Sequence, residues 1–187
     1  SARRTVCLSN LRQISLAVGM YSEDFNGGIP RFHKWLFTKP GDLTTGALYP
    51  YLKAKPVYLC PTDGVELAVK QSQTSRAAAT TAGQNGMAVS RGGSYTRRDF
   101  SYVQNCALCH VNKLTAFVEP SKTLLSLEAR LAFNEYTGVV DPSGALAYRH
   151  QKRGHLMYGD LHIESLDKKA YDKASRDRRF WAANDQR

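Results

Sequence analysis

The large apolar side chains of residues 1–27 recur at helical spacing. They are separated by steps of three and four, which places them on one face of an α-helix: Cys7, Leu11, Ile14, Val18, Tyr21 and Phe25. Asn26-Gly27-Gly28 tolerates the left-handed conformation of a helix C-cap, and Pro30 blocks continuation of the helix. At the other end, Arg3 and Arg4 place cations where the helix dipole favours anions. We therefore expect residues 1–27 to be the C-terminal half of a longer helix.

The second half of the chain carries short apolar runs that predict strands. Residues 123–127 follow a Pro-Ser turn, and residues 145–149 form a second run. Two further runs, 155–158 and 161–164, are separated by Gly159-Asp160, and a two-residue loop of this kind is typical of a β-hairpin. Residues 123–166 therefore predict a small antiparallel sheet. Aromatic residues within 168–182 predict a short terminal helix.

The middle of the chain has weaker signals. Residues 57–60 resemble a short strand that ends at the turn signal Pro61-Thr62-Asp63-Gly64. Residues 71–94 are rich in Ala, Thr, Ser, Gln and Gly, which predicts a long mobile loop. The chain has 187 residues, of which 42% are hydrophobic, and this suits one core. We expect a single α+β domain over residues 1–187, with the helix packed on the sheet and long loops between.

The chain carries a formal charge of +10, from 26 basic and 16 acidic residues. Such an excess favours nucleic acid or anionic glycans as partners. The basic residues are scattered rather than gathered in one run, so a solvated and mildly basic surface explains them as well. No apolar run reaches the eighteen or so residues that a membrane span requires.

Cys106-Ala107-Leu108-Cys109-His110 has the spacing that attaches c-type haem, in which the thiols bond the porphyrin and the histidine binds iron. A local Cys106–Cys109 disulfide, a redox dithiol and a partial metal site are the alternatives. A zinc site is disfavoured because adjacent Cys109 and His110 do not easily reach one ion.

His150, Asp160 and His162 form a second candidate cluster. The predicted hairpin returns the chain beside the strand that carries His150, so the three side chains could converge, and such groups can bind a metal or exchange protons. The alternative is structural, because an Asp in a turn commonly caps its own backbone. Nucleophile elbows, phosphate-binding glycine loops and paired catalytic carboxylates are missing from the sequence, so we expect no enzyme.

Several segments resemble landmarks of bacterial prepilin-type proteins. The resemblance is to the type II secretion pseudopilin-like branch, whose C-terminal signature is His, nine residues, then Asp-Gly. In this chain His150 is followed by nine residues and Asp160, with Leu161 at the position of the glycine. The other matching segments are Cys7 to Gln13, Tyr51-Leu52-Lys53, Cys60-Pro61-Thr62-Asp63, Pro120-Ser121-Lys122-Thr123 and Arg149-His150.

The resemblance implies a pilin-like fold and a role in assembly rather than catalysis. It implies a leader and an apolar helix half upstream that anchors the protein in the inner membrane, with a periplasmic or extracellular globular domain. Its partners would be other pilin or pseudopilin subunits and the secretion machinery, and no cofactor is implied. The alternatives are a minor-pilin-type module that binds DNA or anionic glycan, and an electron-transfer protein with covalent haem c.

Cys7 and Cys60 acquire a role in this setting. Cys7 lies on the apolar stripe of the helix and Cys60 ends an apolar run, so both would meet in the core. In an exported protein that arrangement favours a disulfide, and two separate buried thiols are the alternative. Closing a loop of about fifty residues would stabilise the fold by roughly 4 kcal/mol in the chain-entropy model.

Overall fold

The computed structural model describes residues 2–31, 34–82, 97–135, 137–140 and 146–183, with the backbone alone for 74–82. The α+β class is confirmed, with an N-terminal helix, a sheet and short C-terminal helices. The helices are α1 (Ala2–Asp24), α2 (Tyr49–Leu52), α3 (Pro61–Ala82), α4 (Lys168–Ala174) and α5 (Arg178–Trp181). The strands are β1 (Tyr102–Asn105), β2 (Leu124–Glu128), β3 (Val139–Val140), β4 (Arg153–Tyr158) and β5 (Ile163–Asp167).

The strands form one five-stranded sheet in the order β3-β1-β2-β4-β5. The pairs β1–β2, β2–β4 and β4–β5 are antiparallel, but β1 and β3 are parallel. The expected purely antiparallel sheet is therefore wrong, and the sheet is mixed. β1 lies outside the predicted range of 123–166. Its sequence did not predict a strand, because half of its four residues are polar and its pattern is too short to stand out. Of the predicted run 145–149, the described part makes one isolated bridge, Ala129 to Leu146.

The predicted hairpin is present as β4 and β5, although its loop is longer than expected. Four residues, 159–162, connect the strands instead of two. Leu161 takes a positive φ of 68°, and the backbone N–H of Tyr158 donates to the carbonyl of His162 at 3.0 Å. The Asp160 carboxylate accepts from the backbone N–H of His162 at 3.1 Å, which stabilises this wider turn.

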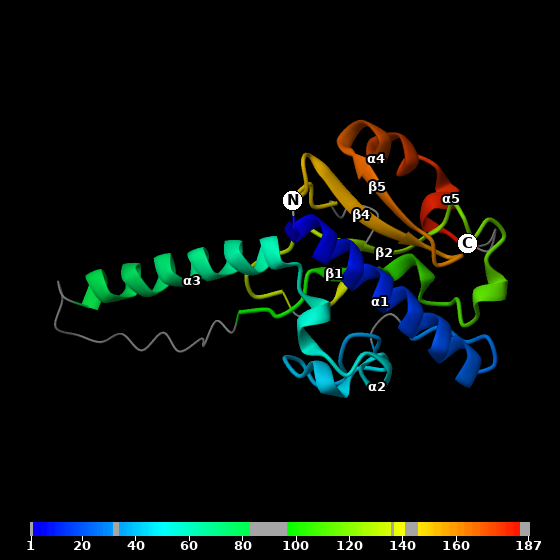
Figure 1. Cartoon of the computed structure of the whole chain (residues 1–187), viewed down its shortest axis with the longest axis horizontal. Helices are drawn as coiled ribbons and strands as arrows, with labels where there is room; N and C mark the ends of the chain where they lie inside the picture. The colour runs from blue at the N-terminus through cyan, green and yellow to red at the C-terminus, as the bar shows by residue number, and fades with distance from the viewer. Residues whose placement is uncertain (1, 32–33, 83–96, 136, 141–145, 184–187) are drawn as a thin grey trace.

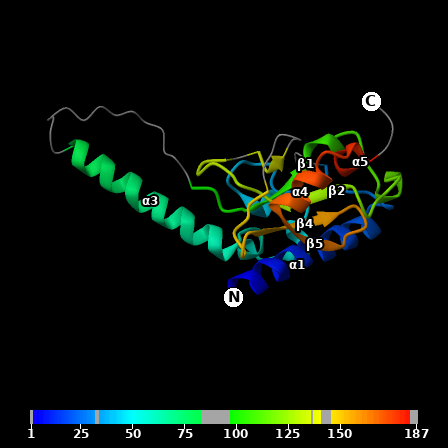
Figure 2. The same cartoon turned by 90° about the horizontal axis from the view of Figure 1, so that it is seen from above.

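α1 lies across one face of the sheet, and α4 and α5 lie toward the opposite face (Figures 1 and 2). Two successive residues of β4 show this division. Met157 lines a small cavity together with Ile14 and Val18 of α1, whereas the Tyr158 ring meets Phe180 of α5 at 6.2 Å between centroids. Successive side chains of a strand point to opposite faces, so the two helical layers sandwich this part of the sheet.

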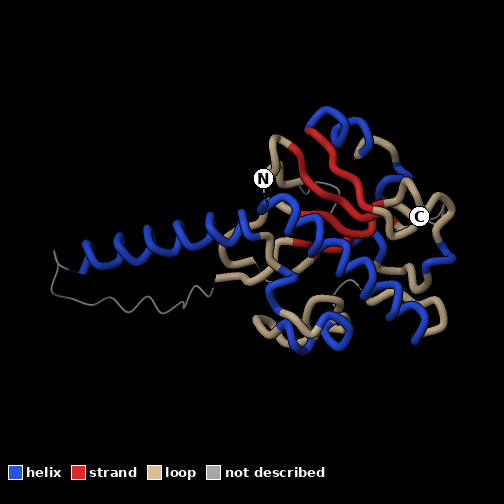
Figure 3. The backbone as a smooth tube through the Cα atoms, viewed as in Figure 1, coloured by secondary structure: helices blue, strands red, loops and turns tan. Residues whose placement is uncertain are grey.

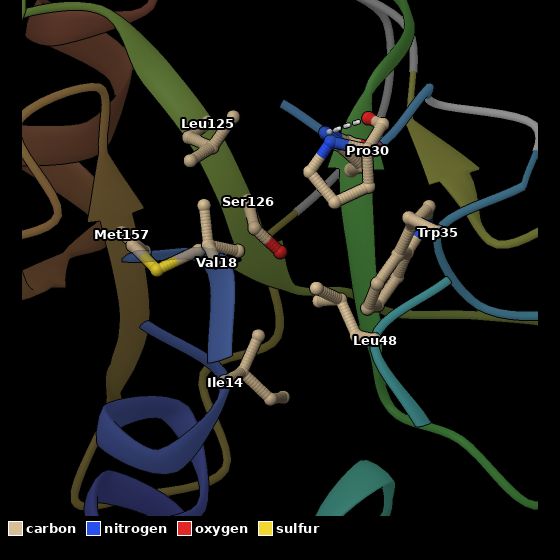
Figure 4. Close-up of a pocket in the computed structure, with 9 residues that line it drawn as sticks. Ile14, Val18, Pro30, Trp35, Leu48, Leu125, Ser126 and Met157 are labelled. Atoms are coloured by element: carbon tan, nitrogen blue, oxygen red, sulfur yellow. Dashed lines mark hydrogen bonds between the residues drawn. The ribbon is translucent and has the colours of Figure 1, made fainter. Parts of the chain in front are cut away.

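The cavity beneath α1 has a volume of about 10 Å³. Val18 lies beside Met157 and Leu125, and Ile14 lies on the side toward Leu48 (Figure 4). Such a space holds about one water molecule and no organic ligand. The contact between α1 and the sheet is therefore a packed core.

The position of α3 shows that two predictions for the middle of the chain are wrong. Residues 71–82, predicted as part of a mobile loop, continue the helix that begins at Pro61, and residues 83–94 lie outside the described part. The run 57–60 is no strand either, since Lys55–Tyr58 form a 3₁₀ turn and the turn signal after Cys60 is the first turn of α3. Proline is favoured at a helix start, and Ala, Gln and Lys are good helix formers. Beyond its first turns α3 extends away from the body of the molecule (Figure 3).

The predicted terminal helix over 168–182 is divided into α4 and α5. Asp167 caps α4 by accepting from the backbone N–H of Ala170 at 2.9 Å. Asp177 caps α5 by accepting from the N–H of Arg179, also at 2.9 Å. A second N-cap inside the segment starts a new helix rather than continuing the first. Among the described residues, none of the helices combines the length and apolar character that a bilayer crossing requires.

Candidate functional site

A disulfide joins α1 to the start of α3. Cys7 of α1 and Cys60, the residue before α3, are both fully buried, and their Cα atoms lie 5.2 Å apart. Neighbouring groups hold both backbones in place. The Cys60 N–H donates to Ser101 Oγ at 2.9 Å, and the Tyr102 hydroxyl donates to the Cys7 carbonyl at 3.1 Å. The bond therefore ties the helix to the region where β1 begins.

His150 lies against this disulfide. A tight turn positions it, in which the central residues Gln151 and Lys152 have φ of 53° and 61°, as a type I′ turn requires. Its Nε2 is 3.4 Å from Cys60 Sγ and 3.3 Å from Oε2 of Glu128, the last residue of β2. Both side chains are buried. The approach to Glu128 is close but poorly directed, because within the described residues Oε2 has no hydrogen-bond partner.

His155 of β4 extends the cluster beneath α1. Its ring stacks on that of His150 at 4.8 Å, and its Nδ1 lies 2.7 Å from Ser165 Oγ. Burial, followed by the neighbouring His150 and Arg4, lowers the pKa of His155 to about 4. The imidazole is therefore neutral at pH 7.

Asp63, in the first turn of α3, is the centre of a buried ion network. Its carboxylate accepts from both terminal nitrogens of Arg98, at 2.5 and 2.9 Å, and from Ser101 Oγ at 2.6 Å. Arg149 Nη2 reaches the same carboxylate at 2.8 Å. Arg149 also reaches Glu128 Oε1 at 3.5 Å and the more exposed Glu66 at 3.2 Å. Each buried charge thus has an opposite charge beside it, as burial of ions demands.

These contacts bring together segments that are far apart in the sequence. Cys7, Cys60 with Asp63, and Arg149 with His150 meet in one buried cluster, to which β2 contributes Glu128. The cluster locks α1, α3 and the sheet to one another. It also places one ligand atom each from Cys7, Cys60, Glu128 and His150 within 4.8 Å of one another.

The structure does not bring Asp160 and His162 to His150, and Asp160 caps its own turn as the structural alternative has it. Asp160 and His162 form an exposed pair, with Nδ1 2.5 Å from Oδ1, and the His162 ring stacks on Tyr158. His150 lies just before β4 and the pair lies just after it. Six residues of extended chain separate the two sites by roughly 20 Å, because each residue of a strand advances about 3.3 Å.

Cys106, Cys109 and His110 lie around a 3₁₀ turn that follows β1. The backbone N–H of Cys109 donates to the Cys106 carbonyl at 3.1 Å. Cys109 and His110 are exposed, and the two cysteines are not joined to each other by a disulfide. The structure therefore does not contain the local Cys106–Cys109 disulfide, and the haem attachment stays a prediction.

Sequence reasoning missed three residues of the buried cluster. Glu128 carried a signal, since it is a single carboxylate at the end of a mostly apolar run, where a buried partner is needed. Asp63 was taken as part of a turn, although it is also a good first-turn residue for a helix. Arg98 carried no signal, because its partners come from other elements.

We compared the chain with family models, curated proteins and solved structures. No family model matches the chain, and no curated protein or solved structure matches it at a significant level. A function has to be argued from the geometry of this molecule.

Proposed function

We propose that this protein is a non-enzymatic, pilin-like assembly subunit of the type II secretion pseudopilin or type IV pilus kind. In this proposal it is anchored to the inner membrane, its globular domain works outside that membrane, and its partners are other such subunits. The sequence resemblance supplies the class. One structural observation supports it, which is that α1 carries large apolar side chains on both of its sides.

The inner side of α1 is covered by the sheet and includes Leu11, Ile14 and Val18, all at most 4% exposed. The outer side carries Val6, Leu16 and Met20, which are 44%, 67% and 52% exposed. Leu16 and Met20 stand one helical turn apart, and Val6 lies nearly three turns before Leu16. We call these three residues the outer stripe.

The outer stripe contributes little to the core of the isolated molecule. Single exposed apolar residues are ordinary on protein surfaces. Here, however, three large apolar side chains share the outer side of one helix with polar residues such as Arg12 and Gln13, and such a mixed face suits a contact with a partner better than a core. Packing α1 against helices of neighbouring subunits would bury the outer stripe, which is the contact that a pilin-like assembly requires.

The buried cluster supports the same role. α1 is joined to the head through the Cys7–Cys60 disulfide and through packing on the sheet. A subunit that assembles through its helix must keep the helix and head in one fixed relation, so that the position of one determines the position of the other.

The polyanion-binding alternative has less support. Arg98 and Arg149 are among the basic residues that motivated it, and both are buried in ion pairs with Asp63. These two arginines are therefore not available to a polyanion, and the buried carboxylates of Asp63 and Glu128 balance their charges.

The test is a double variant, Leu16→Gln with Met20→Gln, made in the protein as its own cells produce it. Both side chains are more than half exposed, so the melting temperature of the purified protein should change little. Recovery of the subunit in the assembled, membrane-associated complex should fall several-fold.

A matched control is Lys169→Gln with Lys173→Gln, two exposed positions four residues apart on α4. It should leave recovery at the wild-type level. Wild-type recovery of the Leu16/Met20 variant would contradict the proposal, as would equal loss in both variants.

A further inference from the structure

We propose that Cys7, Cys60, Glu128 and His150 bind one divalent zinc-like ion when the two cysteines are reduced. The disulfide and the metal site would be two alternative states of the same buried cluster. This inference does not depend on the proposed assembly role, because it rests only on the contacts among these four side chains.

The geometry suits a tetrahedral ion. Bonds of about 2.0–2.3 Å from a tetrahedral Zn²⁺ place neighbouring ligand atoms roughly 3.3–3.8 Å apart. His150 Nε2 already lies 3.4 Å from Cys60 Sγ and 3.3 Å from Glu128 Oε2. All four residues are buried, and each offers a ligand atom within 4.8 Å of the others. Two sulfurs, one imidazole nitrogen and one carboxylate oxygen are ligands that Zn²⁺ accepts.

Glu128 gives a second and independent indication of a ligand. It is 0% exposed, and within the described residues its Oε2 has no hydrogen-bond partner. Leaving a buried polar atom without a partner costs about 1–3 kcal/mol, and more for a charged group. A cation bound to Oε2 would remove that cost, and Oε2 is the oxygen that faces His150.

The surroundings fit the charge and the orientation that such a site needs. Two thiolates and a carboxylate bring three negative charges to a doubly charged ion, and Arg149, 3.5 Å from Glu128 Oε1, offsets the remaining one. Ser101 and Tyr102 fix the backbones of the two cysteines. Outer partners of this kind orient metal ligands.

The exchange between the two states balances. A dithiol reductant gives two electrons and two protons to the Cys7–Cys60 bond, which breaks into two thiols while the reductant becomes a disulfide. The ion then displaces both thiol protons to solvent. In the reverse direction a disulfide oxidant takes two electrons from the thiolates and two protons from solvent and becomes a dithiol, while the Cys7–Cys60 bond forms and the ion is released to solvent.

The experiment uses protein made in a reducing cytosol and purified without oxygen, compared with the same protein after oxidation. Cys106→Ser with Cys109→Ser is the background, so that Cys7 and Cys60 supply all the thiols. Co²⁺ is the probe, because tetrahedral thiolate coordination gives it visible absorption bands. The reduced protein should bind one Co²⁺ with these bands, Zn²⁺ should displace it, and the oxidised protein should show none.

Ligand variants decide whether this cluster is the site. His150→Gln and Glu128→Gln should each weaken Co²⁺ binding by roughly 100-fold, at least the loss that follows removal of an outer partner. His162→Gln, the exposed histidine at the far end of β4, is the matched control and should bind like the background. If a ligand variant fails to fold when reduced, refolding of the reduced background by Zn²⁺, followed by circular dichroism, decides instead.

Four results would overturn the proposal: no Co²⁺ bands in the reduced protein, equal binding after oxidation, unchanged binding in His150→Gln and Glu128→Gln, or no Zn²⁺-dependent refolding where that second test applies.

Discussion

Both sides of α1 carry large apolar side chains, but only the outer side also carries charged residues such as Arg12 and Glu23, and the two sides differ in what covers them. The inner side meets the sheet and a buried cluster of sulfur, imidazole and carboxylate groups, and it includes residues with no exposed surface, such as Cys7 and Leu11. The outer side presents Leu16 and Met20 to solvent. Apolar character alone therefore does not tell which side stabilises the fold. The inner side should determine stability, and the outer side should determine association.

The largest effect should come from the covalent link on the inner side. Cys7→Ala with Cys60→Ala removes a disulfide that spans 53 residues. The free energy of unfolding, measured in urea under oxidising conditions, should fall by about 4 kcal/mol, because the unfolded chain regains the entropy that the loop removed. Cys106→Ala with Cys109→Ala is the control and should cost under about 1 kcal/mol. Equal losses in the two variants would refute the special role of the inner pair.

The same substitution on the two sides of the helix gives the second contrast. Leu11→Ala removes a side chain that is 0% exposed and should lower the free energy of unfolding by about 3 kcal/mol. Leu16→Ala, five residues later and 67% exposed, should change it by less than about 0.5 kcal/mol. Chemical denaturation of both variants checks this. A destabilisation by Leu16→Ala as large as that of Leu11→Ala would mean that α1 is oriented differently.

The inner side should also respond to pH through His155. Its pKa is about 4 in the folded protein, below the value of about 6.5 in the unfolded chain. The unfolded state therefore binds more protons in this window. Stability is full above pH 6.5 and decreases as the pH falls toward 4, by about 2 to 3 kcal/mol.

Urea unfolding at pH 7 and pH 4.5 measures this difference. His155→Gln should reduce the loss of stability between the two values, whereas His162→Gln, at an exposed position, should keep the wild-type loss. Other acidic groups also titrate in this pH range. The test is therefore the difference in stability loss between His155→Gln and His162→Gln. A wild-type pH dependence in His155→Gln would contradict the assigned pKa.

Local patterns in the sequence account for much of the fold. α1 is readable because six apolar residues recur at helical spacing before Asn26 and Gly27, and both of these take positive φ. The β4–β5 hairpin is readable from its runs and its Gly-Asp turn. α3 was missed because residues 71–82 lack an apolar stripe, and helix-forming side chains alone give only a weak signal. β1 and β3 were missed because they are short and derive their stability from neighbouring strands.

The candidate site was less predictable than the fold. The sequence directs attention to Cys7, Cys60 and His150, each by a pattern around it. It does not indicate that His150 faces Cys60 while His162 lies at the far end of β4, because that depends on which end of the strand each occupies. Long-range partners such as Arg98 emerge only when folding brings distant segments together.

The central claim is that the outer stripe of α1 is covered by another subunit. Site-specific photo-cross-linking from Leu16, in the protein as its own cells produce it, tests this most directly. The account predicts a cross-linked product that contains a second copy or another small helical subunit, and no such product from the same probe at Lys169 on α4. Absence of a product from Leu16, or the same products from both positions, would contradict the claim.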